Sequence, residues 1–491
     1  MRIARTLAVG ALVALVGCHG TRSASHSAPP AVANGFPATR WVPANPTYVL
    51  ASPTVKDAQR SFTGALDSLG VVVGVDASEV GKELSQMLAV DPLSPDAVAG
   101  MGIDLEGGIA MFSEDVAPTF VVHLTTPEAA SAFFDRQRER GLVTQSVVVD
   151  GTEIFTAQLL ANVKVSWAVA NDWLWVHFTL PFGHDDGQTW FASSHRPERP
   201  TWSKDWQWAS RAAGTAKPAL IGFLDARDLL AAFVGKVPDA IACAKLLEPI
   251  GRVGIAVETD GKHVAGKLTL DIGAAAARVS SAVVPGPEGF ASVASKAPLA
   301  AQWNVDLLAV RAWLQPCLTS ISSDLGFVDR YGVRTARVVL QSFDPDQKSG
   351  AGAVALDLAH KRYFESRLDD IPLRGTLERS RTFGPHKGHS LSVPFVASVD
   401  YVLTDSLALA AIGDGLLKVV VGSGATVLGP IAAIDIVPAG LSPDAWKMMI
   451  DALDLGHTDR IVERLLRWHD GHVAVTVEGS SLVLTAVGNR R

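Results

Sequence analysis

Two stretches of the chain match one another at a single constant spacing, and this match decides the predicted fold. PDAIACAKLLEPIGRVGIAVE occupies residues 238–258, and TDRIVERLLRWHDGHVAVTVE occupies residues 458–478. Each stretch has apolar residues at helical spacing and then an alternating run that is typical of a strand. The match indicates two copies of one supersecondary unit. The matched pairs are Ile241 and Ile461, Gly251 and Gly471, Val253 and Val473, Val257 and Val477, and Glu258 and Glu478.

Hairpin and helix signals recur in the rest of the chain. Asp150-Gly151 and Asp260-Gly261 each separate two alternating runs, which predicts β-hairpins with two-residue turns. Thr126-Pro127-Glu128 has the sequence of a helix start, with proline at the first helical position. We therefore predict an α+β fold of two related units, each an antiparallel sheet with helices packed on one side.

A stretch rich in Pro, Gly and Ser separates the two predicted units. It reads VPGPEGFASVASKAP, residues 284–298, and strand and helix patterns begin again directly after it. This composition is typical of a linker. The predicted first unit is therefore residues 38–283, and the predicted second unit is residues 299–491.

The first 17 residues have the pattern of a signal peptide. Arg2 and Arg5 give a positively charged start, and Thr6–Val16 is an apolar run. A helix that crosses a bilayer needs about 20 apolar residues, so this run is too short to span one. Residues 1–17 are therefore predicted to direct export.

The end of this run, Leu15-Val16-Gly17-Cys18, resembles the lipobox of bacterial lipoproteins, which the type II signal peptidase cuts before the cysteine. The resemblance implies that Cys18 carries lipid and that the exported chain is held at the membrane by it. Residues 18–37, rich in Ser, Ala and Pro, would then form a lipidated flexible tether. His19 stands where enteric bacteria place an aspartate for inner-membrane retention, which favours the outer membrane. The alternative is an ordinary signal peptide followed by an unmodified cysteine.

The remainder of the chain resembles a broad class of uncharacterised exported bacterial proteins. The shared features are an opening strand, here Pro43-Ala44-Asn45-Pro46-Thr47-Tyr48-Val49, and repeated strand–helix–strand units. The class carries no catalytic motif. The resemblance therefore implies a duplicated α+β body and gives no active-site residue.

Composition limits the classes of function. Of the 491 residues, 48% are hydrophobic and 19% are charged, so the chain can bury large cores and is not disordered as a whole. The net charge is −7 and no basic cluster occurs, which argues against nucleic acid as a partner. The expected partners are a membrane, through the N-terminal lipid, and a protein or a hydrophobic ligand.

Two cysteines remain besides Cys18, and they are Cys243 and Cys317. In an oxidising compartment they can form a disulfide if their geometry allows it. Both lie in helical patterns among apolar neighbours, so two buried free thiols are the alternative. Their wide separation does not suit a zinc site, and no cofactor-binding motif occurs.

Tryptophan is concentrated in one part of the chain, because seven of the 12 lie between residues 167 and 208. Along the strand predicted at 173–178, alternate side chains share a face. A Trp-rich surface could hold an apolar or sugar-like ligand or a partner protein. The alternative is that the tryptophans cover the sheet beneath the loop at 182–211. The candidate surface consists of Trp167, Trp173, Trp175, His177, Trp202, Trp206 and Trp208.

The internal repeat gives one argument for the binding interpretation. When the turn Asn171-Asp172 is aligned with Thr404-Asp405, the positions of Trp173 and Trp175 are taken by Ser406 and Ala408. The fold would then not require large side chains on this face.

The function predicted from these patterns is non-enzymatic binding or scaffolding by a lipid-anchored protein of the cell envelope. One alternative is a carrier that holds lipid or another hydrophobic ligand in an internal cavity. Another is a hydrolase with a dispersed active site that uses residues such as His386 and His389. The sequence shows no nucleophile elbow and no metal-binding motif that would support such an enzyme.

Overall fold

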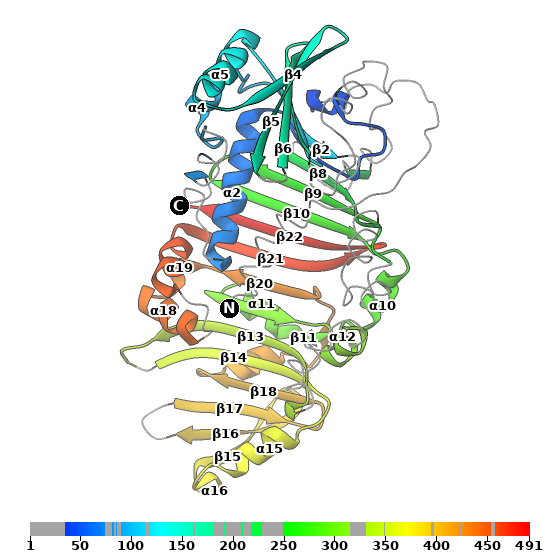
Figure 1. The fold of residues 1–491 in the computed structure, drawn as a ribbon. Helices are drawn as coiled ribbons and strands as arrows, with labels where there is room; N and C mark the ends of the chain where they lie inside the picture. Colours follow the sequence, from blue (N-terminus) through cyan, green and yellow to red (C-terminus); the bar gives the residue numbers. More distant parts are fainter. Residues whose placement is uncertain are drawn as a thin grey trace. The chain divides into compact units, whose positions relative to one another are not determined.

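The computed structural model divides the chain into two compact units. Unit 1 comprises Met1–Ile241 and Ile250–Asp271, and unit 2 comprises Ala242–Pro249 and Ile272–Arg491. Both are rich in antiparallel strands and also carry helices, which confirms the mixed α and β character predicted from the sequence (Figure 1). The structure describes residues 35–73, 81–82, 85, 90–113, 117–160, 163–179, 191, 208–209, 218–227, 249–314, 330–347, 349–393, 397–422, 424–452 and 457–491.

Unit 1 is built on ten described strands joined into one antiparallel sheet. Their spatial order is β4-β5-β6-β7-β3-β2-β1-β8-β9-β10. The elements are η1 (Pro37–Trp41), β1 (Tyr48–Ser52), α2 (Val55–Val73), α4 (Pro95–Ala99), β2 (Ile109–Ser113), β3 (Thr119–His123), α5 (Pro127–Glu139), β4 (Thr144–Val149), β5 (Thr152–Leu160), β6 (Val163–Ala170), β7 (Trp173–Thr179), β8 (Leu220–Asp225), β9 (Arg252–Thr259) and β10 (His263–Asp271).

Local sequence explains where several of these elements begin and turn. Asp150-Gly151 joins β4 to β5 and Asn171-Asp172 joins β6 to β7, and all four residues have positive φ. Two positive φ values in sequence are what a type I′ hairpin turn requires, so Asn, Asp and Gly suit these positions. Helix α5 begins with Pro127 in its first turn, as predicted.

The described residues of unit 2 also form ten strands in one antiparallel sheet, in the order β15-β16-β17-β18-β14-β13-β12-β20-β21-β22. A short ribbon of β11 and β19 lies apart from this sheet. The elements are α10 (Ala275–Ser281), β11 (Gly286–Pro287), α11 (Glu288–Ala294), β12 (Leu299–Trp303), α12 (Leu307–Leu314), β13 (Val333–Asp344), β14 (Ser349–Leu358), α15 (Arg362–Asp369), α16 (Arg374–Leu377), β15 (Glu378–Phe383), β16 (His386–Val393), β17 (Ala397–Leu403), β18 (Leu407–Ile412), α17 (Leu416–Val421), β19 (Thr426–Val427), β20 (Ala432–Ile436), η2 (Pro438–Gly440), α18 (Pro443–Ala452), α19 (Thr458–Leu465), β21 (Trp468–Glu478) and β22 (Ser481–Arg490).

The two units have the same strand order when each is described by itself. Strands β1 to β10 of unit 1 correspond, in both chain order and spatial order, to β12–β18 and β20–β22 of unit 2, with β12 and β13 in the places of β1 and β2. In each unit the third strand is followed by a helix, α5 or α15, before the next hairpin begins. The correspondence therefore extends over the whole of both sheets.

Paired residues give a residue-by-residue correspondence. One row across unit 1 contains Trp175, Val121, Ala110, Ala51, Ile221 and Ala256. The row in the same place of unit 2 contains Leu409, Ala355, Arg337, Gln302, Ala433 and Ala474.

This correspondence differs from the spacing inferred from the sequence. Ala256 corresponds to Ala474 in the structure, whereas the sequence match aligns it with Thr476. The turns of the two hairpins agree with this assignment. The amide of Asp260 donates to the carbonyl of His263 at the β9–β10 turn, and Glu478 pairs with Ser481 at the β21–β22 turn. The sequence match was therefore displaced by two residues. Because side chains alternate with a period of two, this even displacement kept each side chain on its correct face.

The segment predicted to be a linker, 284–298, contains structure instead. It forms β11 and α11, and Phe290 and Val293 of α11 are buried in the core of unit 2. Its composition resembled that of a linker, but its apolar residues lie on one side of a helix that packs against α17. The boundary between the compact units lies earlier, after Asp271.

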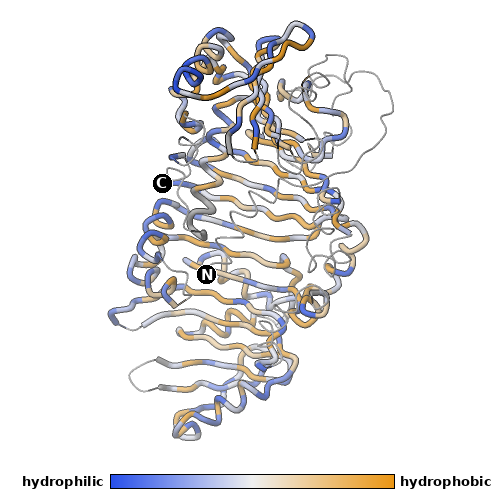
Figure 2. Tube along the Cα trace, in the orientation of Figure 1, coloured by the Kyte–Doolittle hydropathy of each residue, from blue (hydrophilic) through white to orange (hydrophobic). Residues whose placement is uncertain are grey.

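Hydropathy follows this architecture. Strands of both sheets carry long hydrophobic stretches, and hydrophilic residues gather at turns and along parts of the helices (Figure 2). Among the residues that the structure describes, no helix is both long and apolar enough to cross a membrane.

Candidate ligand-binding pocket

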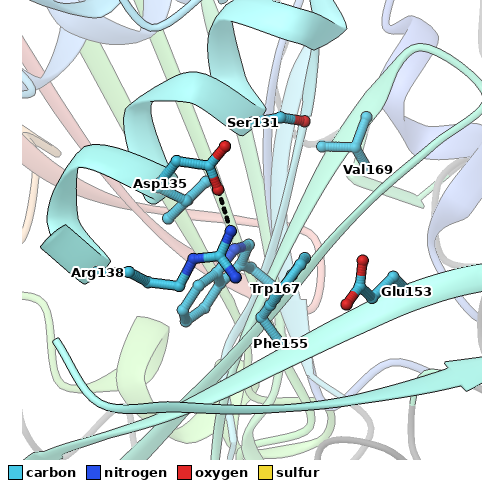
Figure 3. A pocket seen from close by; sticks show the side chains of 8 residues that line it. Ser131, Asp135, Arg138, Glu153, Phe155, Trp167 and Val169 are labelled. Atoms are coloured by element: carbon cyan, nitrogen blue, oxygen red, sulfur yellow. Dashed lines mark hydrogen bonds and ion pairs between the residues drawn. The ribbon is translucent and has the colours of Figure 1, made fainter.

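A pocket of about 290 Å³ lies in unit 1 between helix α5 and strands β5 and β6 (Figure 3). Its position follows from two periodicities. Ser131, Phe134, Asp135 and Arg138 share one face of α5, because residues three or four positions apart lie together on a helix. Residues two apart share a face of a strand, which adds two neighbouring pairs. These pairs are Glu153 with Phe155 on β5 and Trp167 with Val169 on β6.

Three aromatic rings form the apolar part of the pocket. Trp167 is buried, and its ring stacks with Phe134 at a centroid separation of 4.6 Å and with Phe155 at 5.6 Å. Phe155 and Trp167 are directly paired residues of adjacent strands, so the sheet register fixes their contact. The rings therefore make a floor whose shape is set by the backbone of β5 and β6.

Charged side chains surround this floor. Arg138 forms an ion pair with Asp135, and its guanidinium carbon lies 4.8 Å from the ring centre of Phe155. Glu153 stands on β5, across the pocket from Asp135 in Figure 3. Two carboxylates and one guanidinium give the pocket an acidic balance, because Arg138 neutralises only one of them.

This combination can hold a small ligand with a ring or apolar body and a donor group. The aromatic floor favours the apolar part and also attracts a cation. Glu153 can accept hydrogen bonds from an ammonium or hydroxyl group. The volume is near the lower end of ligand-binding pockets, which span about 300–1,000 Å³. Ser131 donates its hydroxyl hydrogen bond to the carbonyl of Pro127, 3.2 Å away, rather than to a general base.

The structure corrects the predicted Trp surface. Trp173, Trp175 and His177 share a face of β7 as expected, but all three are buried. Trp41 of η1 packs edge-on against Trp173 and Trp175, at 6.1 and 5.1 Å between ring centres. These residues belong to the core of unit 1 and do not form an open platform.

The repeat argument for an open Trp face was wrong by one residue. In the β17–β18 hairpin the amide of Thr404 donates to the carbonyl of Leu407, so the turn residues are Asp405 and Ser406. Trp173 and Trp175 therefore correspond to Leu407 and to buried Leu409. Large apolar side chains therefore occupy this place in both units.

The remaining members of the predicted surface are separated. Trp167 faces away from Trp175 across β6 and β7 and lines the pocket. Trp208 is half-buried and packs edge-on against Phe223, at 6.3 Å between ring centres. Five predicted residues lie outside the described residues. They are Cys18, Trp202, Trp206, Cys243 and Cys317.

The two histidines considered for a hydrolase do not converge. His386 and His389 are three residues apart on β16, so they point to opposite faces of the sheet. His389 stacks on Tyr401, and its Nδ1 lies 3.3 Å from Glu378. Within the described part of the chain, no group of three or more His, Cys, Asp or Glu side chains is arranged to hold a metal ion.

Most of the pocket was missed by the sequence argument. Trp167 was selected for composition alone, and Phe134, Arg138 and Glu153 were not selected. The helical spacing of α5 and the alternation of Glu153 with Phe155 were both readable. The packing of α5 over β5 and β6 is not evident from the sequence, because it depends on contacts between residues far apart in the chain.

Comparison with known proteins gives little further information. No family model and no curated protein matches the chain. Among solved structures, crystal forms III, IV and I of TP0453 are similar at 11%, 10% and 11% identity, with TM-scores of 0.28, 0.28 and 0.27. These matches cover 50%, 50% and 49% of this chain and 86%, 84% and 80% of the other. Similarity at this level assigns neither a fold nor a function.

Proposed function

We propose that the chain is a lipid-anchored, non-catalytic binding protein of the cell envelope. Its ligand is a small molecule with a ring body and an ammonium or hydroxyl group, and the binding site is the α5–β5–β6 pocket. One observation carries this proposal: a stacked floor of Phe134, Phe155 and Trp167 lies beneath charged side chains that are not balanced.

The body that presents the pocket is two copies of one α+β unit. The identical strand order and the continuous row of corresponding residues support this duplication. A duplicated body explains how a chain of 491 residues has two sheets with the same strand order and different side chains.

The anchor rests on the lipobox resemblance at Cys18. Cys18→Ala should release the protein from the membrane fraction and abolish incorporation of a labelled fatty acid, because several acyl chains at one residue hold a protein stably. Cys243→Ala is the matched control and should leave both unchanged. Continued sedimentation of Cys18→Ala with membranes would refute the anchor. Separation of inner from outer membranes then tests the outer-membrane assignment.

The pocket is tested by titration calorimetry on the full chain carrying Cys18→Ala. Phenethylamine, which has a ring and an ammonium group, should bind, and benzoate, which has a carboxylate in place of the ammonium, should bind much more weakly. Glu153→Gln should weaken phenethylamine binding by about tenfold or more, since a hydrogen bond to a charged group contributes roughly 1.5–3 kcal/mol.

Glu139→Gln is the control, because Glu139 is an exposed residue of helix α5, which borders the pocket, and does not itself line it. It should leave phenethylamine binding unchanged. Equal weakening by both substitutions, or equal binding of benzoate, would contradict the proposal.

A further inference from the structure

Unit 2 exposes large apolar side chains on one face of its sheet. Ile434 is 45% exposed and Trp303 is 37% exposed, although both belong to strands in the interior of the sheet. Strand pairing places the whole set on the same face, since Val338, Ala301, Ile434 and Val473 are successive partners. We call this set the apolar strip. It consists of Trp303, Val338, Ile412, Ile434, Val473 and Leu484.

Part of the corresponding face of unit 1 is covered by a helix, and Leu268 of β10 is 38% exposed on the same face. Helix α2 packs against β1, β8 and β9, and it crosses in front of β9 and β10 in Figure 1. A Cβ on Gly64 of α2 would lie 3.5 Å from the side chain of Val264, which is ordinary van der Waals contact. Gly222, which corresponds to Ile434, is buried there. In unit 2 the helix that follows the corresponding strand is α12, which contacts β13, and the side chains of the apolar strip are 37–45% exposed.

The dimensions of the apolar strip suit a linear hydrocarbon. It extends from β22 to β18 across seven adjacent strands, which is roughly 29 Å at about 4.8 Å per strand. Its exposed apolar area is on the order of 400 Å², whereas each partner in a standard protein interface buries about 800 Å². The strip is therefore long enough for an extended acyl chain and small for a second copy of the protein.

The side chains on this face change from apolar to polar at one end of the sheet. Beyond Val338 the row of paired residues continues through Val354 and Ala410 to Tyr401 and His389.

The Tyr401 hydroxyl is hydrogen-bonded to Glu378 and lies 3.1 Å from Nη2 of Arg374. Arg374 is also paired with Glu378 and with Asp369, so its charge is balanced and the polar end does not favour an anion. The face is thus hydrocarbon along most of its length and polar at the β16 end.

We propose that the apolar strip binds the acyl chain of a single-chain amphiphile with a zwitterionic or uncharged head, held as a monomer. The acyl chain lies across the strands over Val473, Ile434 and Val338. Three strand spacings separate Val473 from Val338, about 14 Å and the length of a dodecyl chain, so the head lies beyond Val338, over β14 and β18 on the side of the polar end. This site is separate from the α5–β5–β6 pocket and does not depend on it.

The test uses dodecylphosphocholine below its critical micelle concentration, with the full chain carrying Cys18→Ala so that no attached lipid competes. The wild-type strip should bind it saturably. Val473→Asn should weaken binding by at least about tenfold, because a polar group placed under the hydrocarbon loses its water without gaining a partner. Glu153→Gln, which disables the pocket of unit 1, should leave this binding unchanged.

Val487→Asn is the matched control. Val487 is 37% exposed against 40% for Val473, and it lies on the adjacent strand with its side chain on the opposite face, paired with His472. It should not change the affinity. An acyl chain brominated near its middle should quench fluorescence of the protein, and Trp303→Phe should remove that quenching.

Three results would overturn the proposal. They are no binding below the micelle concentration, equal weakening by Val473→Asn and Val487→Asn, or a dimer in analytical ultracentrifugation that Val473→Asn dissociates. The last result would identify a second copy as the occupant of the strip.

Discussion

The two units have one strand order and differ in what covers their sheets. In unit 1 both faces of β7 are buried, because Trp173 and Trp175 face one hydrophobic cluster and Leu174 faces another. In unit 2 the core lies on one face, where α11 and α17 pack together, and the other face carries the apolar strip. The comparison shows that backbone topology sets where side chains point, whereas the segments that pack on each face decide which side chains are buried.

A second difference lies within the core row itself. The position of Ala110 in unit 1 is taken in unit 2 by Arg337, which is 1% exposed. Its guanidinium donates to Asn304 Oδ1 at 2.6 Å, to Asp357 at 2.9 Å and to the carbonyl of Val284 at 3.0 Å. These bonds fasten the segment before β11 to the sheet. Gly286 permits this approach, because a Cβ there would lie 2.5 Å from Nε of Arg337.

The largest expected effect concerns the Trp face. Trp175→Ala should lower the free energy of unfolding by about 4–5 kcal/mol. This is the upper end of the range for replacing a buried aromatic residue with alanine, and it is expected because Trp175 is 1% exposed and its loss leaves a large cavity. Leu409→Ala, at the corresponding position of unit 2, should cost about 3 kcal/mol. Urea unfolding measures both. A loss of less than about 1 kcal/mol for Trp175→Ala would instead indicate that Trp175 is not a core residue and belongs to an exposed binding surface.

Arg337→Ala should have the next largest effect. It removes one partner of a buried ion pair, which typically costs about 3–5 kcal/mol, and the lower end is expected because Asp357 keeps some contact with water. Arg334→Ala is the control in the same strand. Arg334 pairs with Asp306 but is partly exposed, so its loss should cost about 1 kcal/mol or less. Similar losses of unfolding free energy for the two variants would show that buried Arg337 stabilises unit 2 no more than partly exposed Arg334 does.

The smallest effect compares the two equivalent hairpin turns. Asn171 has φ of 53°, a conformation that alanine adopts less readily than asparagine. Asn171→Ala should therefore lower the free energy of unfolding by about 1 kcal/mol. Asp405→Ala, in the corresponding turn of unit 2, should have almost no effect. Equal costs at the two sites would indicate that the turns share one conformation.

Local features of the fold were predictable from the sequence, and long-range ones were not. The turns at Asp150-Gly151 and Asn171-Asp172 and the start of α5 depend on a few neighbouring residues, so the sequence located them. The two matching stretches were visible, but the spacing inferred from the sequence differs from the structural correspondence by one residue at Thr404 and by two near Val257. Those displacements arise because turn length is not evident from the flanking strand patterns.

The candidate site was predictable only in part for a related reason. Trp175 and Trp167 look alike in the sequence, yet one lies in a core and the other lines a pocket. Which of them lines a pocket depends on the segments that pack on each face of β6 and β7. The apolar strip was also hidden, because Ile434 and Val473 have the composition of ordinary buried strand residues.

Hydroxyl-radical footprinting of the full chain, read by mass spectrometry, tests most directly the claim that the apolar strip of unit 2 is open to solvent and to an amphiphile. The account predicts that Trp303 is oxidised several times faster than Trp175, and that dodecylphosphocholine below its micelle concentration protects Trp303 alone. Oxidation of Trp303 as slow as that of Trp175 in the absence of amphiphile would contradict it.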